Sequence, residues 1–258
     1  MNLDLAGKRV LVTGGSKGIG FACARLFLEE GAKVAIVSRS QANIDAALAK
    51  LAGAIGAAAD LIDAGQAAAM VEKVERELGA IDILVNSAGA AKRAAPDDLT
   101  PAFWHAAMDA KYFSYINVMD PVVKLMAKRG SGVIVNIIGH GGKVAASEHL
   151  AGGSANAALM LATVGLAKAY ARQGVRVLGL NPGLTETTRV QEALEVTARS
   201  RGISVAEAKA LGTSRIPLGR FASPEDLANM TVFLASDRAS YVTGVNIGMD
   251  GASTSVVI

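Results

Sequence analysis

The amino-acid sequence predicts a single α/β domain in which a doubly wound parallel sheet of about seven strands is flanked by helices. Short apolar runs of the kind found in strands buried on both faces alternate with helical segments along nearly the whole chain. A glycine-rich stretch, residues 13–20, joins the first of these runs to the first helical segment. The 258 residues suit one large domain, and we see no linker or internal repeat, so we assign residues 1–258 to it.

Composition narrows the possible classes of function. Hydrophobic residues make up 51% of the chain and aromatic residues only 4%, which favours helices packed closely on a sheet over a base-stacking surface. Lys and Arg exceed Asp and Glu by only 26 to 23, without runs of like charge, so we expect no nucleic-acid partner. Cys23 is the only cysteine, which excludes zinc-ligand cysteine clusters, and we expect no bound metal. No uninterrupted apolar run reaches ~18 residues and no signal peptide is visible, so we expect a cytoplasmic protein that does not enter a membrane.

The first half of the chain supplies strands and helices in strict alternation. We predict strands at residues 8–13, 33–37, 54–60 and 81–85. We predict helices at residues 21–30, 41–51 and 64–78. Gly31 marks the end of the first helix, and the third strand, which is rich in alanine, has the weakest pattern of the four.

The second half continues the alternation with one interruption. We predict a long helix over residues 100–128, bent or divided at Pro121. Further strands are predicted at residues 133–138, 174–180 and 245–249, and further helices at 154–172 and 224–234. Residues 188–199 and 205–211 are polar and helix-prone, so we expect residues of about 185–215 to form a substrate loop or lid. Strands separated by helices imply right-handed crossovers and ligands at the carboxyl ends of the strands.

The glycine-rich stretch has the pattern of a nucleotide-binding turn. Gly14 lets the chain turn sharply at the strand end, and Gly18 lets a pyrophosphate approach the backbone without a Cβ in the way. Gly20 allows close packing of the helix on the sheet, and the N-terminus of that helix offers unpaired N–H groups to an anion. Because the stretch lies between a strand and a helix, nucleotide binding is a better interpretation than an ordinary tight turn.

Several motifs then follow in a familiar order. Residues 13–20 read Thr-Gly-x-x-x-Gly-x-Gly, and Asp60-Leu61 follows the third strand. The later motifs are Asn86-Ser87-Ala88-Gly89, Asn181-Pro182-Gly183 with Thr187, and Tyr241-Val242-Thr243-Gly244 with Asp250-Gly251. In order and spacing they resemble the short-chain dehydrogenase/reductase family over nearly the whole chain. The resemblance implies a Rossmann fold, a nicotinamide dinucleotide cofactor and a small-molecule substrate.

The resemblance also assigns cofactor-binding residues. They are Gly14, Ser16, Lys17, Gly18, Ile19, Gly20, Arg39, Asp60, Leu61, Asn86, Ala88, Gly89, Asn156, Pro182, Gly183, Leu184 and Thr187. The choice between NAD and NADP depends on the end of the second strand, where an acidic residue accepts from the ribose 2′-OH and an arginine binds the 2′-phosphate. This chain has Arg39 there and a second cation, Lys17, in the glycine loop, so we predict NADP(H).

The catalytic positions depart from the pattern that the resemblance implies. The family usually carries an Asn in the fourth helix, a Ser after the fifth strand and a Tyr-x-x-x-Lys motif in the next helix. In the alignment that the motifs set, these four positions hold Lys111, Gly139, Gly152 and Asn156. Glycine can neither donate a proton nor polarise a carbonyl, and such proton transfer contributes roughly 10²- to 10⁴-fold to the rate.

Three residues are candidates for the altered catalytic site. Lys111 can send its ammonium toward the space that the family's lysine fills, and Asn156 can hydrogen-bond the ribose of the nicotinamide. His140 follows Gly139 directly, and an imidazole titrates near neutral pH. Lys111 and His140 also have ordinary structural interpretations, as a lysine on a helix surface and as a residue that only lines a pocket.

Three functions remain open at this point. The first, which we favour, is an NADP-dependent oxidoreductase whose proton donor has moved or is water. The second is a non-redox enzyme, such as a lyase or hydrolase, that uses the same pocket. The third is a catalytically silent NADP-binding relative. The resemblance, with the apolar faces of the helices at 100–128 and 154–172, further implies a homotetramer or homodimer.

Overall fold

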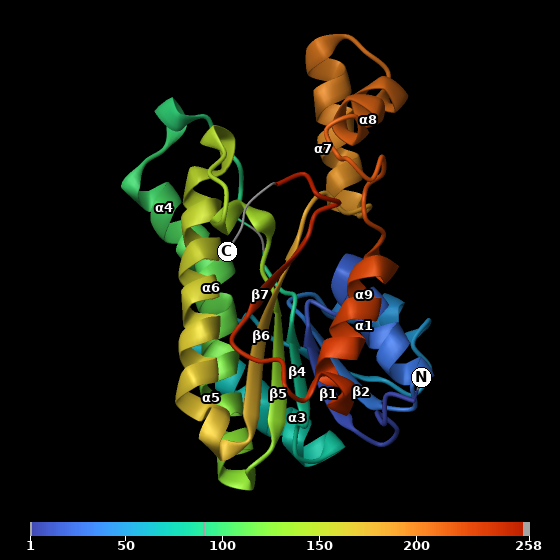
Figure 1. Ribbon diagram of the computed structural model, residues 1–258, viewed down its shortest axis with the longest axis vertical. Helices are drawn as coiled ribbons and strands as arrows, with labels where there is room; N and C mark the ends of the chain where they lie inside the picture. Colours follow the sequence, from blue (N-terminus) through green and yellow to red (C-terminus); the bar gives the residue numbers. More distant parts are fainter. Residues whose placement is uncertain (1, 90, 255–258) are drawn as a thin grey trace.

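The computed structural model describes residues 2–89 and 91–254, and within them it confirms the predicted fold class (Figure 1). One seven-stranded sheet has the order β3-β2-β1-β4-β5-β6-β7, with every neighbouring pair parallel. Its strands are β1 (Arg9–Thr13), β2 (Lys33–Ser38), β3 (Ile55–Ala58), β4 (Ile83–Asn86), β5 (Gly132–Ile137), β6 (Val175–Pro182) and β7 (Asn246–Met249). The strand order reverses between β1 and β4, and ligands of such sheets bind at the carboxyl ends beside this point.

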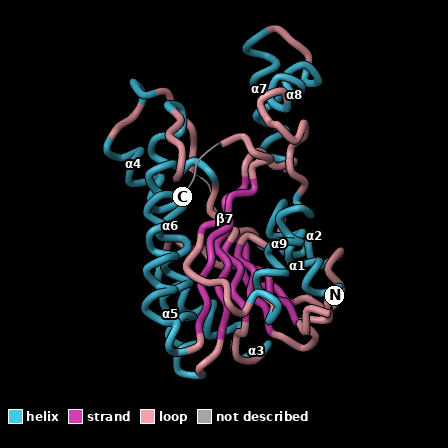
Figure 2. Tube along the Cα trace, viewed as in Figure 1, coloured by secondary structure: helices cyan, strands magenta, loops and turns pink. Residues whose placement is uncertain are grey.

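Helices cover both faces of the sheet (Figure 2). They are α1 (Gly18–Glu29), α2 (Gln41–Leu48), α3 (Ala64–Leu78), α4 (Pro101–Met108), α5 (Ser114–Arg129), α6 (Leu150–Tyr170), α7 (Thr188–Arg201), α8 (Val205–Thr213) and α9 (Pro224–Ala235). The side chains of β1 alternate between the two faces of the sheet and pack into two separate cores. Val10 and Val12 belong to a core with α1, α2 and α9, whereas Leu11 belongs to the opposite core with α3, α5 and α6.

The predicted break in the long helix was placed wrongly. A π-helical turn at Asp109–Phe113 separates α4 from α5, and Pro121 lies inside α5. Proline removes one backbone hydrogen bond, but Val118 and Val122 of the same helix are buried against the sheet, and this packing carries the helix past the proline.

The start of α6 was also predicted too late. The helix begins at Leu150 and not at residue 154, so that Gly152 lies within its first turn. Glycine lowers helix propensity, which hid this turn in the sequence. In the fold, Ala151 and Gly152 are buried, and tertiary packing outweighs the local preference.

By length and composition alone, the helical stretch Ser147–Gln173 could cross a membrane. Half of its most apolar window is buried inside the protein, and Ala155, Leu159 and Ala167 are among the residues that pack inward. The same stretch therefore serves as a core helix beside β5 and β6.

Arg176 of β6 connects α9 to the sheet through hydrogen bonds. Its Nη1 donates to the carbonyl oxygens of Leu234 and Val242 at 2.8 and 3.2 Å, and its Nη2 to those of Ala235 and Ser236 at 3.4 and 3.0 Å. Three of these carbonyls lie at the C-terminal end of α9, where helix carbonyls lack intrahelical partners and a cation is favoured. Arg176 thus fixes α9 and the connection to β7 together.

We expect Arg176→Met to lower the free energy of unfolding by about 2–3 kcal/mol, because it leaves buried carbonyls without a donor. Urea denaturation is the measurement. Arg76→Met is the control, since Arg76 is exposed on α3 and contacts Glu72 only at 3.8 Å; it should change stability by less than ~0.5 kcal/mol. Equal stabilities of the two variants would contradict the role given to Arg176.

Candidate functional site

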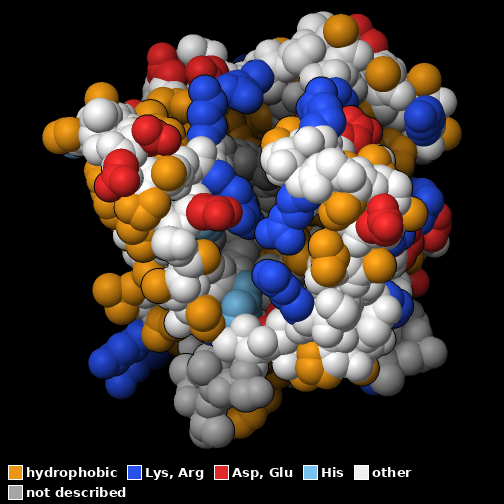
Figure 3. All heavy atoms as spheres, turned by 90° about the horizontal axis from the view of Figure 1, so that it is seen from above, with side chains coloured by type: hydrophobic (Ala, Val, Ile, Leu, Met, Phe, Trp, Pro, Cys, Tyr) orange, Lys and Arg blue, Asp and Glu red, His pale blue; other side chains and the backbone are white. Residues whose placement is uncertain are grey.

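The carboxyl edge of the sheet is hollowed, with Lys and Arg side chains around the hollow and histidine within it (Figure 3). A cavity of about 670 Å³ lies beside the carboxyl ends of β1, β2 and β4. Seven residues that the sequence assigns to cofactor binding line it: Gly14, Lys17, Arg39, Asp60, Leu61, Ala88 and Gly89. Of the other assigned residues, Ser16, Gly18, Ile19 and Gly20 belong to the loop and first turn of α1 that border this cavity.

The remaining cofactor candidates come from the other half of the chain. Pro182 ends β6, and Thr187 caps α7 by accepting from the Val190 N–H at 3.4 Å. A Cβ on Gly18 would lie 3.4 Å from the Thr187 side chain, so the start of α7 reaches the glycine loop. Leu184, in contrast, lines a separate cavity of about 600 Å³ between α9 and the end of β7.

The glycine loop is shaped by close backbone contacts. A Cβ on Gly14, whose φ is +66°, would lie 2.7 Å from the carbonyl oxygen of Ser87 and 2.9 Å from Cα of Ala88. A Cβ on Gly20 would collide with Gly14 O, so this glycine allows α1 to pack on the loop itself. Lys17, the N-cap of α1, makes no side-chain capping bond, which leaves the N–H groups of the first turn to an anion.

A chain of buried hydrogen bonds joins the strand ends beneath the site. Thr13 Oγ1 donates to Asn86 Oδ1 at 3.2 Å, and Asn86 Nδ2 donates to Asn136 Oδ1 at 3.0 Å. Asn136 Nδ2 then donates to Thr163 Oγ1 of α6 at 2.9 Å. All four residues are fully buried, so the Asn86 side chain braces the sheet, and only its backbone is left to approach a cofactor.

Two cations stand at the cofactor cavity without competing partners. Lys17 and Arg39 both line it, and neither forms an ion pair with any residue that the structure describes. Lys17 comes from the glycine loop, and Arg39 directly follows β2. Their charges are therefore available to an anionic ligand.

Lys111 lies on the π-helical turn with its side chain almost completely buried. Its Nζ donates to Tyr115 Oη at 2.8 Å and to the carbonyl oxygen of Ile137 at 3.0 Å, and it lies 4.4 Å from the centre of the Tyr115 ring. The ammonium is thus held at the carboxyl end of β5, immediately before Gly139. This brings Lys111 to the region where the sequence predicts catalysis.

Gly139 and Asn156 meet at the same strand end. Gly139 has a φ of +126°, a conformation that residues with side chains rarely adopt. A Cβ on Gly139 would lie 3.1 Å from Nδ2 of Asn156, whose Oδ1 is buried without a hydrogen-bond partner in the described parts of the chain. An acceptor in such a position suits a ligand that donates a hydrogen bond.

His140 faces the end of β7. Its Nε2 lies 3.5 Å from Oδ2 of Asp250, and both ring nitrogens are buried. Among the described residues, neither nitrogen has a partner with hydrogen-bond geometry. His140 therefore lies beside a carboxylate that would pair with it when the ring is protonated.

His149 lies in the same stretch of the chain as His140 and is not among the catalytic candidates predicted from the sequence. It ends the short turn Ser147–His149, and its Nε2 and Nδ1 lie 2.7 and 2.8 Å from the point that a Cβ on Gly152 would occupy. Burial lowers the pKa of His149 below 6.5, and the positive charges of Arg93 and Lys111 lower it further. The available signal was the glycine at position 152, which leaves space for a side chain from the preceding turn.

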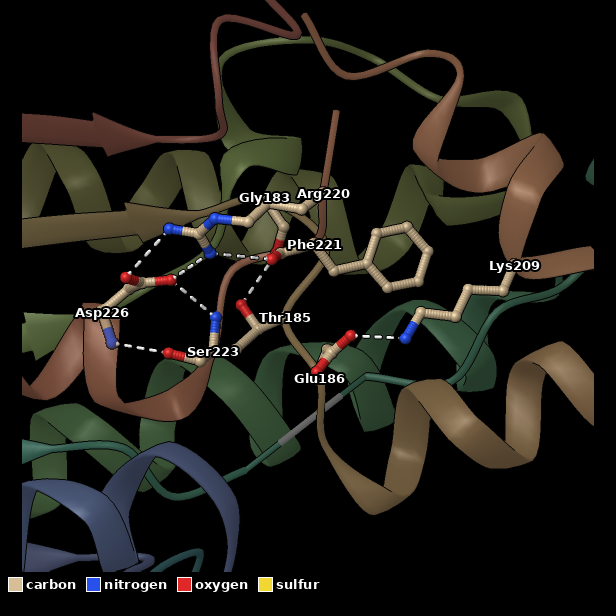
Figure 4. A network of polar contacts seen from close by, with 8 residues as sticks. All are labelled: Gly183, Thr185, Glu186, Lys209, Arg220, Phe221, Ser223 and Asp226. Carbon is tan, nitrogen blue, oxygen red and sulfur yellow. Dashed lines mark hydrogen bonds and ion pairs between the residues drawn. The ribbon is translucent and has the colours of Figure 1, made fainter. Parts of the chain in front are cut away.

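The predicted lid, residues 185–215, starts beside the segment that leads into α9, where Arg220 pairs with Asp226 (Figure 4). Thr185 pairs with Ala222 as an isolated bridge, and Glu186 N donates to the Ala222 carbonyl at 2.8 Å. Glu186 also forms an ion pair with Lys209 of α8 at 2.6 Å. From this base α7 and α8 project beyond the carboxyl edge of the sheet, where they can cover a ligand (Figure 1).

Within residues 2–89 and 91–254, no group of three His, Cys, Asp or Glu residues lies close enough together to hold a metal ion.

Comparison with known proteins agrees with the fold and the motif order. Residues 14–254 match a family model described as enoyl-(acyl carrier protein) reductase. The chain is 36% identical over 265 residues to a 3α-hydroxysteroid dehydrogenase of Mediterraneibacter gnavus, covering 99% of this chain and 100% of the relative. It is 34% identical over 257 residues to a 3-oxoacyl-[acyl-carrier-protein] reductase of Thermotoga maritima, covering 96% and 98%.

Solved structures give the same result. The L-sorbose reductase of Gluconobacter frateurii, complexed with NADPH and L-sorbose, superposes with a TM-score of 0.94 at 28% identity and full coverage of both chains. An actinorhodin polyketide ketoreductase with NADPH superposes with a TM-score of 0.93 at 28% identity, covering 97% of this chain and 98% of the other. Both superpositions extend over the candidate site as well as the sheet.

Gly14 and Gly7 offer a matched test of the contact between the glycine loop and β4. Both have positive φ, +66° and +75°, but a Cβ on Gly7 would meet nothing within 4 Å. We expect Gly7→Ala to cost about 1 kcal/mol of backbone strain and Gly14→Ala about 1–3 kcal/mol more, because its methyl group overlaps Ser87 and Ala88. Chemical denaturation measures both, and similar losses would show that the close approach at Gly14 does not limit stability.

Proposed function

This chain belongs to the short-chain dehydrogenase/reductase family and is a nicotinamide-dependent oxidoreductase, and from that premise we propose that it prefers NADP and acts on a small molecule through a non-standard active site. The observation that carries the cofactor preference is the pair Lys17 and Arg39 on one cavity. The preference agrees with the NADPH complexes of structurally similar proteins.

The cofactor site fits NADP in charge and shape. The uncapped first turn of α1 suits the pyrophosphate, while Arg39 and Lys17 suit the dianionic 2′-phosphate that NAD lacks. Asp60 and Leu61 line the same cavity near Arg39 and suit the adenine end. When bound, the reduced dinucleotide would supply a hydride.

The non-standard active site is supported by the surroundings of two glycines. The φ of +126° at Gly139 disfavours a serine there, and the ring of His149 fills the space that a tyrosine at position 152 would enter. We infer that neither position supplies the family's usual hydroxyl. Lys111 keeps a positive charge near the reacting carbonyl, Asn156 remains to hydrogen-bond the nicotinamide ribose, and His140 with Asp250 lines the substrate side.

The direct test of oxidoreductase activity is a screen for NADPH oxidation with ketones, quinones, imines and activated alkenes. Turnover of any class supports the proposal and narrows the substrate. Tight NADPH binding without turnover across the panel would favour a catalytically silent NADP-binding relative.

We expect NADPH to bind the unmodified protein more tightly than NADH, and Arg39→Asp to weaken NADPH binding by roughly 10- to 100-fold, because a charged hydrogen bond contributes ~1.5–3 kcal/mol. NADH binding should be retained or improved, since an aspartate there accepts from the ribose 2′-OH. Calorimetric titration gives both constants. Arg172→Asp, in the short turn Ala171–Gln173 that precedes the amino end of β6, is the control for net charge. Equal affinities for both cofactors in the unmodified protein would reject the proposal.

We also propose that the chain assembles through the helical layer that contains α5 and α6, as a homotetramer or homodimer. Leu161 on α6 is 75% exposed and Val164 beside it is 39% exposed, so this helix presents apolar side chains to solvent in the single chain. A closed symmetric interface would bury them.

We expect Leu161→Arg to shift the assembly toward smaller species, because it places a charge in the proposed interface. Sedimentation velocity at micromolar concentration measures this. Val196→Arg, which replaces an exposed apolar residue of α7, should leave the assembly unchanged. A monomer in the unmodified protein would refute the proposed interface.

A further inference from the structure

We propose that His149 exchanges the proton with the substrate oxygen, in the place that a tyrosine side chain at position 152 would otherwise fill. The inference rests on the proposed oxidoreductase function and deepens it by naming the proton donor. It is carried by the position of the ring, by its buried nitrogen and by the charges that surround it.

The ring lies where side chains of the first turn of α6 would begin. Besides the two ring nitrogens, Cε1 of His149 lies against the Cβ position of Gly152. On its other side the ring packs on Gly141, with Cδ2 at 3.0 Å from the Cβ position there. Nδ2 of Asn156 lies 3.7 Å from that same point, so the imidazole and the Asn156 amide meet around one glycine. The imidazole fits because positions 141 and 152 both lack a side chain.

The ring of His149 is held by packing at Gly141 and Gly152. Nδ1 of His149 is buried and has no hydrogen-bond partner among the residues that the structure describes. A structural histidine in a protein interior normally has its nitrogens bonded. We therefore assign the exchanged proton to the other ring nitrogen, Nε2.

The charges around the ring set its protonation. Lys111 approaches from the π-helical turn and Arg93 from the segment before α4, while Glu148 lies within 4.0 Å of Arg93 and His140 occupies the neighbouring turn. Burial and the two cations all lower the pKa of His149, so the imidazole is neutral at neutral pH. A neutral imidazole can accept a proton from an alcohol, and it can pass a proton from water to a developing alkoxide.

The step balances without a further reactant. In reduction, two electrons and one proton reach the carbonyl carbon as the hydride that the bound cofactor supplies, and the C=O double bond becomes a C–O single bond. The neutral imidazole first takes a proton from solvent at Nε2, and the resulting imidazolium gives that proton to the oxygen and returns to the neutral form. In oxidation, Nε2 accepts the hydroxyl proton as the carbon gives up the hydride.

The first test compares His149→Gln with the unmodified protein in single-turnover hydride transfer, using a substrate from the NADPH-oxidation screen. We expect the rate to fall by roughly 10²- to 10⁴-fold, with the NADPH dissociation constant unchanged within about twofold. The pH dependence of the rate that reflects His149 should disappear. His105→Gln, which changes an exposed histidine on α4, is the control and should match the unmodified protein.

The second test needs neither cofactor nor turnover. The chain has three histidines, so NMR titration with the His→Gln variants assigns each imidazole. We expect the pKa of His149 to lie below 6.5 in the unmodified protein and to rise in Lys111→Met, because the variant removes a nearby positive charge.

The outcomes separate the two proposals. If the unmodified protein transfers hydride and His149→Gln does so at the same rate with the same pH profile, the role of His149 is wrong and the proposed function stands. A His149 pKa at or above 6.5 that ignores Lys111→Met would also overturn the inference. If the unmodified protein binds NADPH but transfers hydride to no substrate in the panel, the proposed function itself fails, and the proton role fails with it.

Discussion

The chain of buried hydrogen bonds from Thr13 through Asn86 and Asn136 to Thr163 is the constraint on which the candidate site depends. It links the carboxyl ends of β1, β4 and β5 to the middle of α6. Polar groups buried in this way cost about 1–3 kcal/mol each when a partner is lost, so the strand ends cannot separate without leaving several groups unsatisfied. The glycine loop at one end and the β5–α6 region at the other are therefore held in a fixed relation, as transfer between a bound cofactor and a substrate requires.

Glycines decide what the rest of the site can contain. At Gly14 the absence of a Cβ lets two backbone segments approach each other, which shapes the cofactor cavity. At Gly152 and Gly141 the absent Cβ atoms leave room for a neighbouring side chain, the imidazole of His149. An alanine at position 14 would crowd the two backbone segments. An alanine at position 141 or 152 would instead displace the imidazole of His149. The glycine at position 152 therefore makes room for an imidazole from the preceding turn.

Much of the fold followed from the sequence because local pattern and tertiary structure agree there. The helix predicted at 64–78 is α3 to the residue, since its apolar face is regular and Asp63 caps it. The prediction failed where packing overrides local preference, at Pro121 inside α5 and at Gly152 inside α6. The cation pair at the cofactor cavity was predictable from its place after β2 and in the glycine loop. His149 was not, because its importance depends on space left by another residue three positions later, which no periodicity reveals.

In the mechanism that we propose, Lys111 and His149 divide between them the positive charge and the proton transfer at a site with glycine at position 152. A buried ammonium is costly unless it is well bonded, and that of Lys111 is held by a carbonyl oxygen and a phenol oxygen, with the face of Tyr115 nearby. Burial lowers the pKa of His149 most, and the charges of Arg93 and Lys111 lower it further; a positive charge at Lys111 would also favour negative charge on a substrate oxygen. The positive charge and the transferable proton then reside on different residues. Under this proposal the residue that stabilises an alkoxide, Lys111, is not the residue that transfers the proton, His149, so the site does not depend on a single group for both tasks.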